Sequence, residues 1–317
     1  MKINLRYLVL VASTLPWVCH SAESDSGFGA VPTSIASDRI AKSSDPVNTL
    51  VARVKASLRT LNAGTFDMGD WGNEHGLPYD MASDSRPLHK VTLDSFSMMA
   101  YKVTYDDFDI FTDAIGVERI DIDRYAAKYR APNRPAGVSW YGAEAYCKWL
   151  GKTTGLAFAL PTEAQWEYAA RSGGQRFLYA TDNGKIDYGR NYPAEWKDGP
   201  KPPIPNVGSY PANPAGLHGM SEETFEWVAD WYDENYYKIS PNKNPTGPAT
   251  GTKKVHRGKL GGSAEAFALV FARGKELPQE LTHDFSFETK KTTASPLPGY
   301  SGYPSSNFRC AVNPAVH

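Results

Sequence analysis

The chain has 317 residues, with 34 Lys and Arg against 35 Asp and Glu, and a formal net charge of −1 at pH 7. This balance gives no electrostatic footprint for nucleic acid or for an anionic membrane surface. Hydrophobic residues make up 41% of the sequence and charged residues 22%, which is typical of a globular protein with a full core.

The first 22 residues have the pattern of a secretory signal. A positively charged start precedes an apolar run from Tyr7 to Val18, and a small-residue stretch follows it up to Ala22. The apolar run is too short to span a bilayer. We therefore expect cleavage after Ala22, export to the periplasm and no membrane insertion afterwards. Residues 23–44 are then predicted to be a flexible segment and residues 45–317 a single domain.

Three elements are predicted in the N-terminal third of that domain. Asp45-Pro46 is typical of a helix start, and an apolar stripe at helical spacing continues to Leu61. Residues 65–69 and 91–98 are predicted to be strands. A second helix is predicted to follow Thr104 and to end near Gly116.

Two further helices are predicted in the middle of the chain. Ser139 precedes apolar residues at the spacing of one helix face, namely Ala143, Tyr146, Cys147 and Leu150. Residues 162–165 match a capping box, in which side chains satisfy the first free N–H groups of a helix. Beyond Gly173 regular periodicity almost vanishes, apart from short apolar pieces such as 226–231. A disulfide and bound cations are the candidates for ordering this long irregular part.

Cys147 and Cys310 are the cysteines that remain after the expected cleavage. In an oxidising compartment a lone pair of cysteines favours a disulfide. Closing so long a loop would stabilise the fold by roughly 4–5 kcal/mol before strain is subtracted. Two free buried thiols and a catalytic Cys/His pair are the alternatives.

Separate sequence blocks between residues 60 and 313 carry a family resemblance. In chain order they include Phe66-Asp67-Met68-Gly69, Arg86-Pro87-Leu88-His89, Arg134-Pro135-Ala136-Gly137, Leu160-Pro161-Thr162-Glu163, Asn213-Pro214-Ala215-Gly216, Gly261-Gly262-Ser263 and Asn307-Phe308-Arg309-Cys310. Together they resemble the formylglycine-generating-enzyme-like, or sulfatase-modifying-factor, family. The resemblance implies an α+β, C-type-lectin-related mixed fold with low regular secondary structure. It also implies a disulfide between Cys147 and Cys310, as in secreted relatives.

The oxidases of this family bind copper through two cysteines that follow the Gly-Gly-Ser motif. Laid on residues 261–263, the motif places these positions at Ala266 and Phe271, and neither side chain can ligate a metal. We therefore expect no copper and no conversion of cysteine to formylglycine. The histidines have no metal-ligand spacing, so an iron or zinc site would require distant residues to converge.

The resemblance also implies structural Ca²⁺, which is held by hard oxygen ligands. The residues that match the first site are Asn191, Tyr192 and Asp198, and those that match the second are Gly219, Glu222, Thr224 and Glu226. In the second set, a glycine stands where the family often has an Asn or Asp side chain. The alternative for both sets is a solvated acidic turn.

Some family members lack both copper cysteines and act in periplasmic pyoverdine maturation, in which a (dihydro)quinoline-type siderophore chromophore is oxidised. The resemblance implies a similar role here, with a small-molecule or peptidic metabolite as partner. Glu265, beside the Gly-Gly-Ser motif, is the candidate general base, and Arg273 is the candidate ligand of a carboxylate or oxyanion. Trp140, Tyr141 and Trp227 are candidates for stacking on the chromophore. The alternatives are an exposed loop charge for Glu265 and core positions for the aromatic residues.

A second hypothesis is a periplasmic binding, recognition or inhibitor protein on the same fold, without catalysis. Residues 274–302 are polar and rich in Thr, Ser and Pro, which fits a recognition loop as well as a lid.

Overall fold

The structure describes most of the chain from Asp45 onward, and within this part capping side chains set the helix starts. In this computed structural model, the described residues are 45–121, 127–195, 198, 202–222, 224–258, 265–286 and 291–313, with backbone alone for 282–286 and 291–294. The expected export signal and the segment 23–44 lie outside these ranges. The described residues from Asp45 onward belong to one compact unit.

The α-helices of the described part are α1 (Pro46–Ser57), α2 (Tyr105–Ile115), α3 (Trp140–Thr154) and α4 (Glu163–Ala170). Thr104 and Thr162 form complete capping boxes, and the hydroxyl of Ser139 accepts the N–H of Gly142. These positions confirm the predicted starts of α2, α3 and α4. Short 3-10 helices lie at η1 (Gly72–His75), η2 (Ala127–Tyr129), η3 (Tyr236–Lys238) and η4 (Glu265–Ala268).

The first helix is shorter than its apolar stripe predicts. Residues 58–61 leave the helix and form β1 (Leu58–Leu61), with Leu58 opposite Met99 and Leu61 opposite Phe96 of the next strand in the sheet. The prediction of helix up to Leu61 is wrong because pairing with a strand that is distant in sequence satisfies this backbone better.

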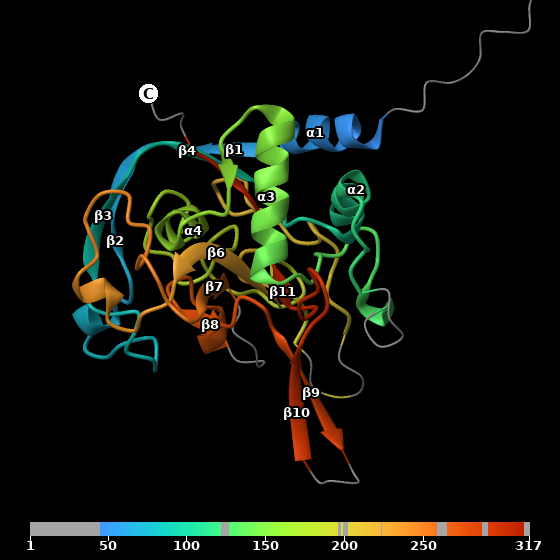
Figure 1. Cartoon of the computed structure of the whole chain (residues 1–317). Coiled ribbons are helices and arrows are strands. Elements are labelled where there is room, and N and C mark those ends of the chain that lie inside the picture. The colour runs from blue at the N-terminus through green and yellow to red at the C-terminus, as the bar shows by residue number, and fades with distance from the viewer. Residues whose placement is uncertain are drawn as a thin grey trace, which may run out of the picture. The chain divides into compact units, whose positions relative to one another are not determined.

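Two four-stranded sheets and two strand pairs make up the β-structure of the described residues. One sheet has the order β1-β4-β12-β5, with β4 (Phe96–Met99), β5 (Phe158–Ala159) and β12 (Ala311–Val312). The other has the order β11-β6-β7-β8, with β6 (Phe225–Trp231), β7 (Lys254–Gly258), β8 (Gly274–Glu276) and β11 (Ser306–Asn307). Figure 1 shows α3 crossing in front of these sheets, with α1 and α2 on one side.

The strand predicted over residues 91–98 is divided into two strands that belong to different sheets. β3 (His89–Leu93) pairs with β2 (Gly64–Met68), whereas β4 lies in the first four-stranded sheet. The division falls at Asp94, whose N–H donates to the side chain of Asn244 at 3.0 Å instead of to a strand partner.

Residues 274–302, predicted as a recognition loop or lid, contain β8 and a hairpin. The hairpin consists of β9 (Leu281–Ser286) and β10 (Lys291–Pro296), with Leu281 opposite Pro296. It extends away from the two sheets (Figure 1).

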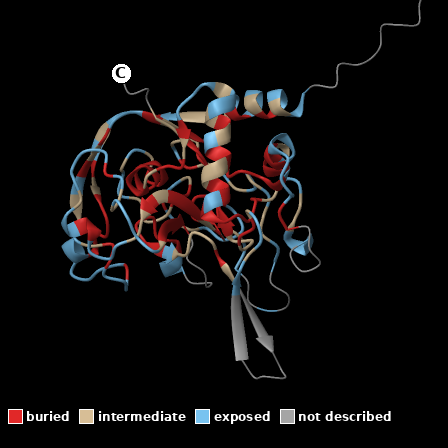
Figure 2. Cartoon of the chain, in the orientation of Figure 1, coloured by how far each residue is buried: buried red, intermediate tan, exposed pale blue. Residues whose placement is uncertain are grey.

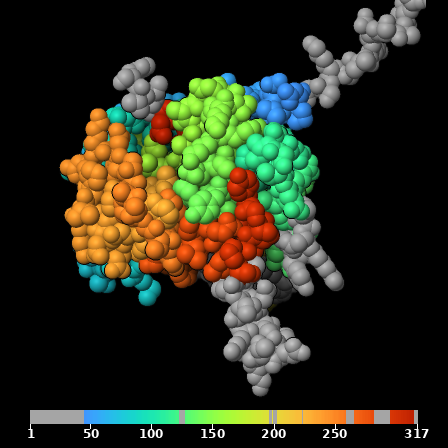
Figure 3. Space-filling model, in the orientation of Figure 1, coloured from blue at the N-terminus to red at the C-terminus, as the bar shows by residue number. Residues whose placement is uncertain are grey.

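Buried side chains form two clusters around the sheets (Figure 2). The first contains Trp166 of α4, Val255 of β7 and Phe271. The second lies among α1, α2 and α3, and it includes the disulfide between Cys147 and Cys310, whose sulfur-bearing side chains are fully buried. The predicted cysteine pairing is thus present in the structure. On the surface, α2 and α3 lie side by side (Figure 3).

No helix within the described ranges combines the length and apolar character needed to cross a membrane.

Candidate functional site

Glu265 begins the 3-10 helix η4 and is exposed. The Gly-Gly-Ser motif just before it lies outside the described residues. The carboxylate of Glu265 shares a hydrogen bond with the hydroxyl of Tyr179, from a loop far away in the sequence. Burial, followed by this carboxylate, raises the pKa of Tyr179 to about 12. The structure therefore places a solvent-accessible carboxylate next to a phenol that stays protonated at neutral pH.

Two further aromatic residues, Phe267 and Tyr188, are associated with this pair. Phe267, two residues after Glu265, is 45% exposed, and Tyr188 is near enough to act electrostatically on Tyr179. We call Glu265, Tyr179, Phe267 and Tyr188 the Glu265 surface. It combines a proton acceptor with exposed aromatic area, which suits contact with a flat aromatic molecule.

The two positions expected to lack copper ligands, Ala266 and Phe271, follow Glu265 in the sequence and differ in exposure. Ala266 is exposed on η4, whereas Phe271 is fully buried and packs edge-on against Trp71 at 4.8 Å between ring centroids. Hydrocarbon side chains at both positions leave no soft ligand for copper there.

A single serine connects the two segments of the Glu265 surface. The hydroxyl of Ser221 accepts the N–H of Ala180 at 2.8 Å and donates to the carbonyl of Ala268 at 3.2 Å. Ser221 is buried and precedes β6. The turn before β6 therefore helps to position both Tyr179 and η4.

Arg273, the candidate anion ligand, lies inside a buried ion-pair network. Its Nε and Nη2 donate to Glu163 at 2.7 and 3.0 Å, and its Nη1 donates to the carbonyl of Asp84 at 2.8 Å. The whole residue is 5% exposed. This position is at odds with the expected role, because the donors that would bind a substrate anion are already directed at protein acceptors.

The same network continues through α4. Arg257 donates to Glu163 at 2.7 Å and to Glu167 at 2.6 Å, and Glu167 also accepts from Arg171 at 3.0 Å. These side chains are almost completely buried. Their charges compensate one another, so the network orders the loops around α4 and leaves none of these arginines free for a ligand.

Two of the three candidate stacking residues have no free ring face. Trp227 is fully buried, and its indole N–H donates to the carbonyl of Val138 at 2.9 Å. Trp140 is 7% exposed, and the ammonium of Lys254 lies 3.8 Å from its ring centroid and 3.7 Å from that of Trp231. A stacking role for these tryptophans is at odds with this packing, which fits the core alternative.

Tyr141 is the accessible member of that predicted set. It is 45% exposed and packs edge-on against Trp140 at 5.6 Å. Burial lowers the pKa of Lys254, whose ammonium lies over the Trp140 ring, to about 8.

The first predicted calcium set is used for loop hydrogen bonds. The side-chain oxygen of Asn191 accepts the N–H of Asp187 at 2.8 Å, and its amide group donates to Asp182 at 2.7 Å. Tyr192 is buried beside it, and Asp198 is exposed with neighbours outside the described residues. In this arrangement the Asn191 oxygen is already committed to an N–H donor. No cluster of three or more His, Cys, Asp or Glu side chains suited to a metal ion occurs in the described part of the chain.

The structure brings the second predicted set together, but around a lysine. The ammonium of Lys102 donates to the hydroxyl of Thr224 at 2.6 Å, and the charges of Glu226 and Glu222 act on it. Gly219 lies against the carboxylate of Glu222, because a Cβ on this glycine would be 3.0 Å from one of its oxygens. Of the residues expected to hold Ca²⁺, Thr224 is thus bonded to a cation that belongs to the chain, and Ca²⁺ binding by this set stays a prediction.

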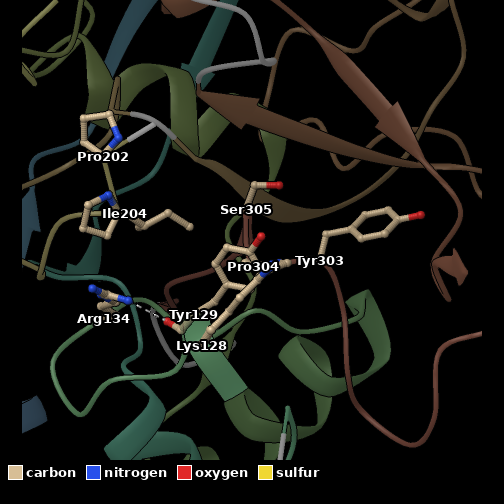
Figure 4. A pocket seen from close by; sticks show the side chains of 9 residues that line it. Lys128, Tyr129, Arg134, Pro202, Ile204, Tyr303, Pro304 and Ser305 are labelled. Carbon is tan, nitrogen blue, oxygen red and sulfur yellow. Dashed lines mark hydrogen bonds between the residues drawn. The ribbon is translucent and has the colours of Figure 1, made fainter. Parts of the chain in front are cut away.

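A separate cavity of about 690 Å³ opens between η2, residues 202–204 and the segment before β11. Its lining consists of Lys128, Tyr129, Arg134, Pro202, Pro203, Ile204, Tyr303, Pro304 and Ser305. Figure 4 shows Pro202 and Ile204 on one side and Pro304 with Ser305 across from them, with Arg134 and Lys128 at one edge. Apolar rings and two cations make this cavity suitable for an aromatic molecule that carries negative charge. No sequence pattern pointed to it, because its walls come from distant loops.

A buried carboxyl group supports one wall of this cavity. Glu280 accepts the N–H of Tyr303 at 2.8 Å and the hydroxyl of Ser306 at 2.5 Å. It is 1% exposed, and burial raises the pKa of Glu280 to about 7.

The described geometry defines an α+β scaffold in which the two positions expected for copper ligands hold the hydrocarbon side chains of Ala266 and Phe271, and the sequence comparison shows the family. Residues 47–289 match the sulfatase-modifying factor enzyme 1-like domain, so the chain belongs to this family. The formylglycine-generating enzyme of Streptomyces coelicolor is 33% identical over 250 residues, which cover 62% of this chain and 76% of that protein. The mouse formylglycine-generating enzyme is 28% identical over 250 residues, covering 62% and 63%.

A chlamydial protein named serine/threonine-protein kinase pkn1, from Chlamydia pneumoniae, is 31% identical over 229 residues. The match covers 66% of this chain and 35% of that protein, so the chain spans about a third of the length of this relative. Among solved structures, PvdO from Pseudomonas aeruginosa aligns with a TM-score of 0.61 and 24% identity over 81% of this chain and 94% of PvdO. Treponema denticola variable protein 1 aligns with a TM-score of 0.57 and 19% identity, over 81% and 95%. These structural likenesses confirm the predicted α+β fold.

Proposed function

We propose that this protein is a periplasmic tailoring protein of the pyoverdine-maturation type. It binds a flat aromatic metabolite at the Glu265 surface and assists oxidation of a (dihydro)quinoline-type ring. The observation that carries the proposal is the exposed Glu265 carboxylate beside Tyr179, on a family scaffold whose copper positions are Ala266 and Phe271. The structural likeness to PvdO supports the choice of this type of function.

The proposed reaction removes two hydrogens from the ring, with dioxygen as the electron acceptor. Glu265 accepts a proton from a ring N–H or phenolic O–H, and the resulting electron-rich ring gives up two electrons. Dioxygen takes the two electrons and two protons, one from Glu265 and the other released by the oxidised ring, and leaves as hydrogen peroxide. The carboxylate is thereby returned to its starting state. Tyr179 acts as a positioning residue that holds the carboxylate, and Phe267 supplies a stacking face.

The export proposal rests on the first 22 residues of the sequence, and the periplasmic location has its own test. Mass spectrometry of protein recovered from the periplasm would show a mature chain that begins near residue 23.

The test of the reaction is the variant Glu265→Gln, which keeps the size and hydrogen-bonding capacity of the side chain but removes the proton acceptor. Turnover of a reduced dihydroquinoline-type precursor should fall by about 10²–10⁴-fold, the usual contribution of a general base. Glu118→Gln is the matched control, because Glu118 is also exposed and lies on another surface. Unchanged turnover in Glu265→Gln, with the control behaving alike, would rule out the mechanism.

A second candidate function is recognition of a ligand without chemistry, and the cavity of Figure 4 favours it. Lys128 and Arg134 carry positive charge at the edge of an aromatic and proline-rich space. In that case an anionic aromatic ligand binds there, and a Lys128→Ala/Arg134→Ala variant loses affinity while Glu265→Gln binds normally. Fluorescence titration of the same ligand against both variants separates the two functions.

A further inference from the structure

A smaller cavity, of about 250 Å³, lies between the turn after β3, the start of α4 and residues 244–246. It shares no lining residue with the cavity of Figure 4 and contains none of the four residues of the Glu265 surface. Leu93 is the one apolar residue of its lining, and the others carry hydroxyl, amide or carboxylate groups. The cavity therefore presents many hydrogen-bonding groups to a small ligand.

Hydrogen bonds fix one wall of this cavity to the end of β3. The N–H of Thr92 donates to the carbonyl of Asn242 at 2.6 Å, and the N–H of Asn244 donates to the carbonyl of Thr92 at 2.9 Å. The N–H of Asp94 donates to the side-chain oxygen of Asn244 at 3.0 Å, and the Asn244 amide group donates to the Asp94 carboxylate at 2.7 Å. The wall is therefore already formed, and binding requires little further ordering of it.

A buried glutamine holds the facing wall. Gln165 of α4 is 9% exposed, and its side-chain oxygen accepts the N–H of Thr162 at 2.9 Å. Its amide group donates to the side-chain oxygen of Asn313 at 2.7 Å. Three polar side chains from the start of α4 and from the segment after β12 are thereby held in one arrangement, so both walls present their groups at defined positions.

The charges of the lining do not suit an anionic ligand. At the start of α4 the N–H of Glu163 donates to the Asp230 carboxylate at 2.8 Å, and the capping box uses the next donors, so the helix offers no free N–H group to an anion. Asp94 adds a negative charge to the lining. The ammonium of Lys243 lies 3.5 Å from Asp94 on a side chain that is 70% exposed, so it compensates this charge from the solvent side.

We propose that this cavity binds a neutral polyhydroxyl ring, that is, a single sugar residue. The Asp94 carboxylate accepts hydrogen bonds from sugar hydroxyls, and the exposed hydroxyls of Ser95 and Thr246 both donate and accept. The volume lies below the roughly 300–1,000 Å³ of sites for drug-sized ligands, which fits one ring rather than an extended chain. This binding site is separate from the Glu265 surface, and the proposal does not depend on the proposed function.

The test is titration of the full chain with glucose, galactose, mannose and N-acetylglucosamine, each as the free sugar and as its methyl glycoside, followed by ligand-detected NMR. We expect at least one of these sugars to bind. Ser95→Ala/Thr246→Val should weaken that binding by about 10-fold or more, because it removes two hydroxyl partners from exposed positions. Thr153→Val is the control, because Thr153 is exposed on α3 and its hydroxyl donates to the carbonyl of Trp149.

The two forms of each sugar distinguish the two sources of such a ligand. Tighter binding of a methyl glycoside supports the terminal sugar of a glycan, whereas tighter binding of the free sugar supports a free monosaccharide. Absence of binding by the wild type at tens of millimolar of every sugar would overturn the proposal, and so would equal affinity in Ser95→Ala/Thr246→Val. Glucuronate is the charged comparison, and tighter binding of glucuronate than of glucose would contradict the neutral class of ligand.

Discussion

Glu280 shows how a single buried group can couple the fold to pH. Burial raises its pKa from 4.5 to about 7, so the folded protein favours the protonated carboxyl group. The stabilisation from this proton is complete below the unfolded pKa of 4.5 and is lost as the pH rises through about 7. A raised carboxyl pKa thus makes the protein less stable toward neutral and alkaline pH.

We therefore predict that Glu280→Gln flattens the dependence of the unfolding free energy on pH. The amide mimics the protonated acid, because it can donate to Ser306 while its oxygen accepts from Tyr303. The difference in unfolding free energy between the wild type and Glu280→Gln should change by at most roughly 3 kcal/mol between pH 4.5 and 8. Urea unfolding across this range is the measurement, and Glu144→Gln on the surface is the control. Parallel curves for wild type and Glu280→Gln would contradict the assignment.

At the residue scale, the sequence identified Glu265 but none of the other residues of the Glu265 surface. Glu265 could be chosen because it follows the Gly-Gly-Ser motif. Tyr179 and Lys102 could not, since an isolated tyrosine or lysine has no pattern that points to a partner far away in the sequence. Arg273 and Trp227 were misjudged for a related reason: their residue types suit ligand binding, and only burial reveals the protein acceptors that they already contact.

At the scale of elements, α4 is held by buried ion pairs as well as by apolar packing. All eight of its residues are buried, and they include Glu163 and Glu167. Glu167 accepts from Gly69 at 2.9 Å, from Arg171 at 3.0 Å and from Arg257 at 2.6 Å. The position of this helix therefore depends on donors from three separate parts of the chain.

We predict that Glu167→Gln destabilises the protein by about 3–5 kcal/mol, because buried Arg171 loses its counter-charge and buried Arg257 keeps only Glu163 of its two. Glu144→Gln is the matched change on α3, where an exposed i,i+4 pair with Lys148 contributes only about 0.3–0.5 kcal/mol. Chemical unfolding of the three proteins measures the difference. Equal losses in both variants would show that the network does not determine the stability of α4.

Elements with local signals were predictable from sequence. The starts of α2, α3 and α4 follow from Thr104, Ser139 and Thr162, because a capping side chain acts within three residues. The end of α1 and the division at Asp94 were not predictable. Both depend on tertiary pairing, which places Leu58 opposite Met99 and Asp94 next to Asn244.

At the scale of the molecule, the fold followed from the order of several sequence blocks, and the family match confirms it. The disulfide between Cys147 and Cys310 was expected on the same basis and is present. What the blocks did not reveal is the cavity of Figure 4, whose walls come from η2, residues 202–204 and 303–305. Apart from Arg134, the lining residues lie outside the shared blocks, so no single motif marks the position of the cavity.

The central claim is that this scaffold assists ring oxidation without a copper site at Ala266 and Phe271. The most direct measurement is turnover of a reduced dihydroquinoline-type precursor by purified protein of known copper content, before and after treatment with a copper chelator. The account predicts turnover that is independent of copper content, with one hydrogen peroxide formed for each ring oxidised. Turnover that rises and falls with bound copper would contradict it.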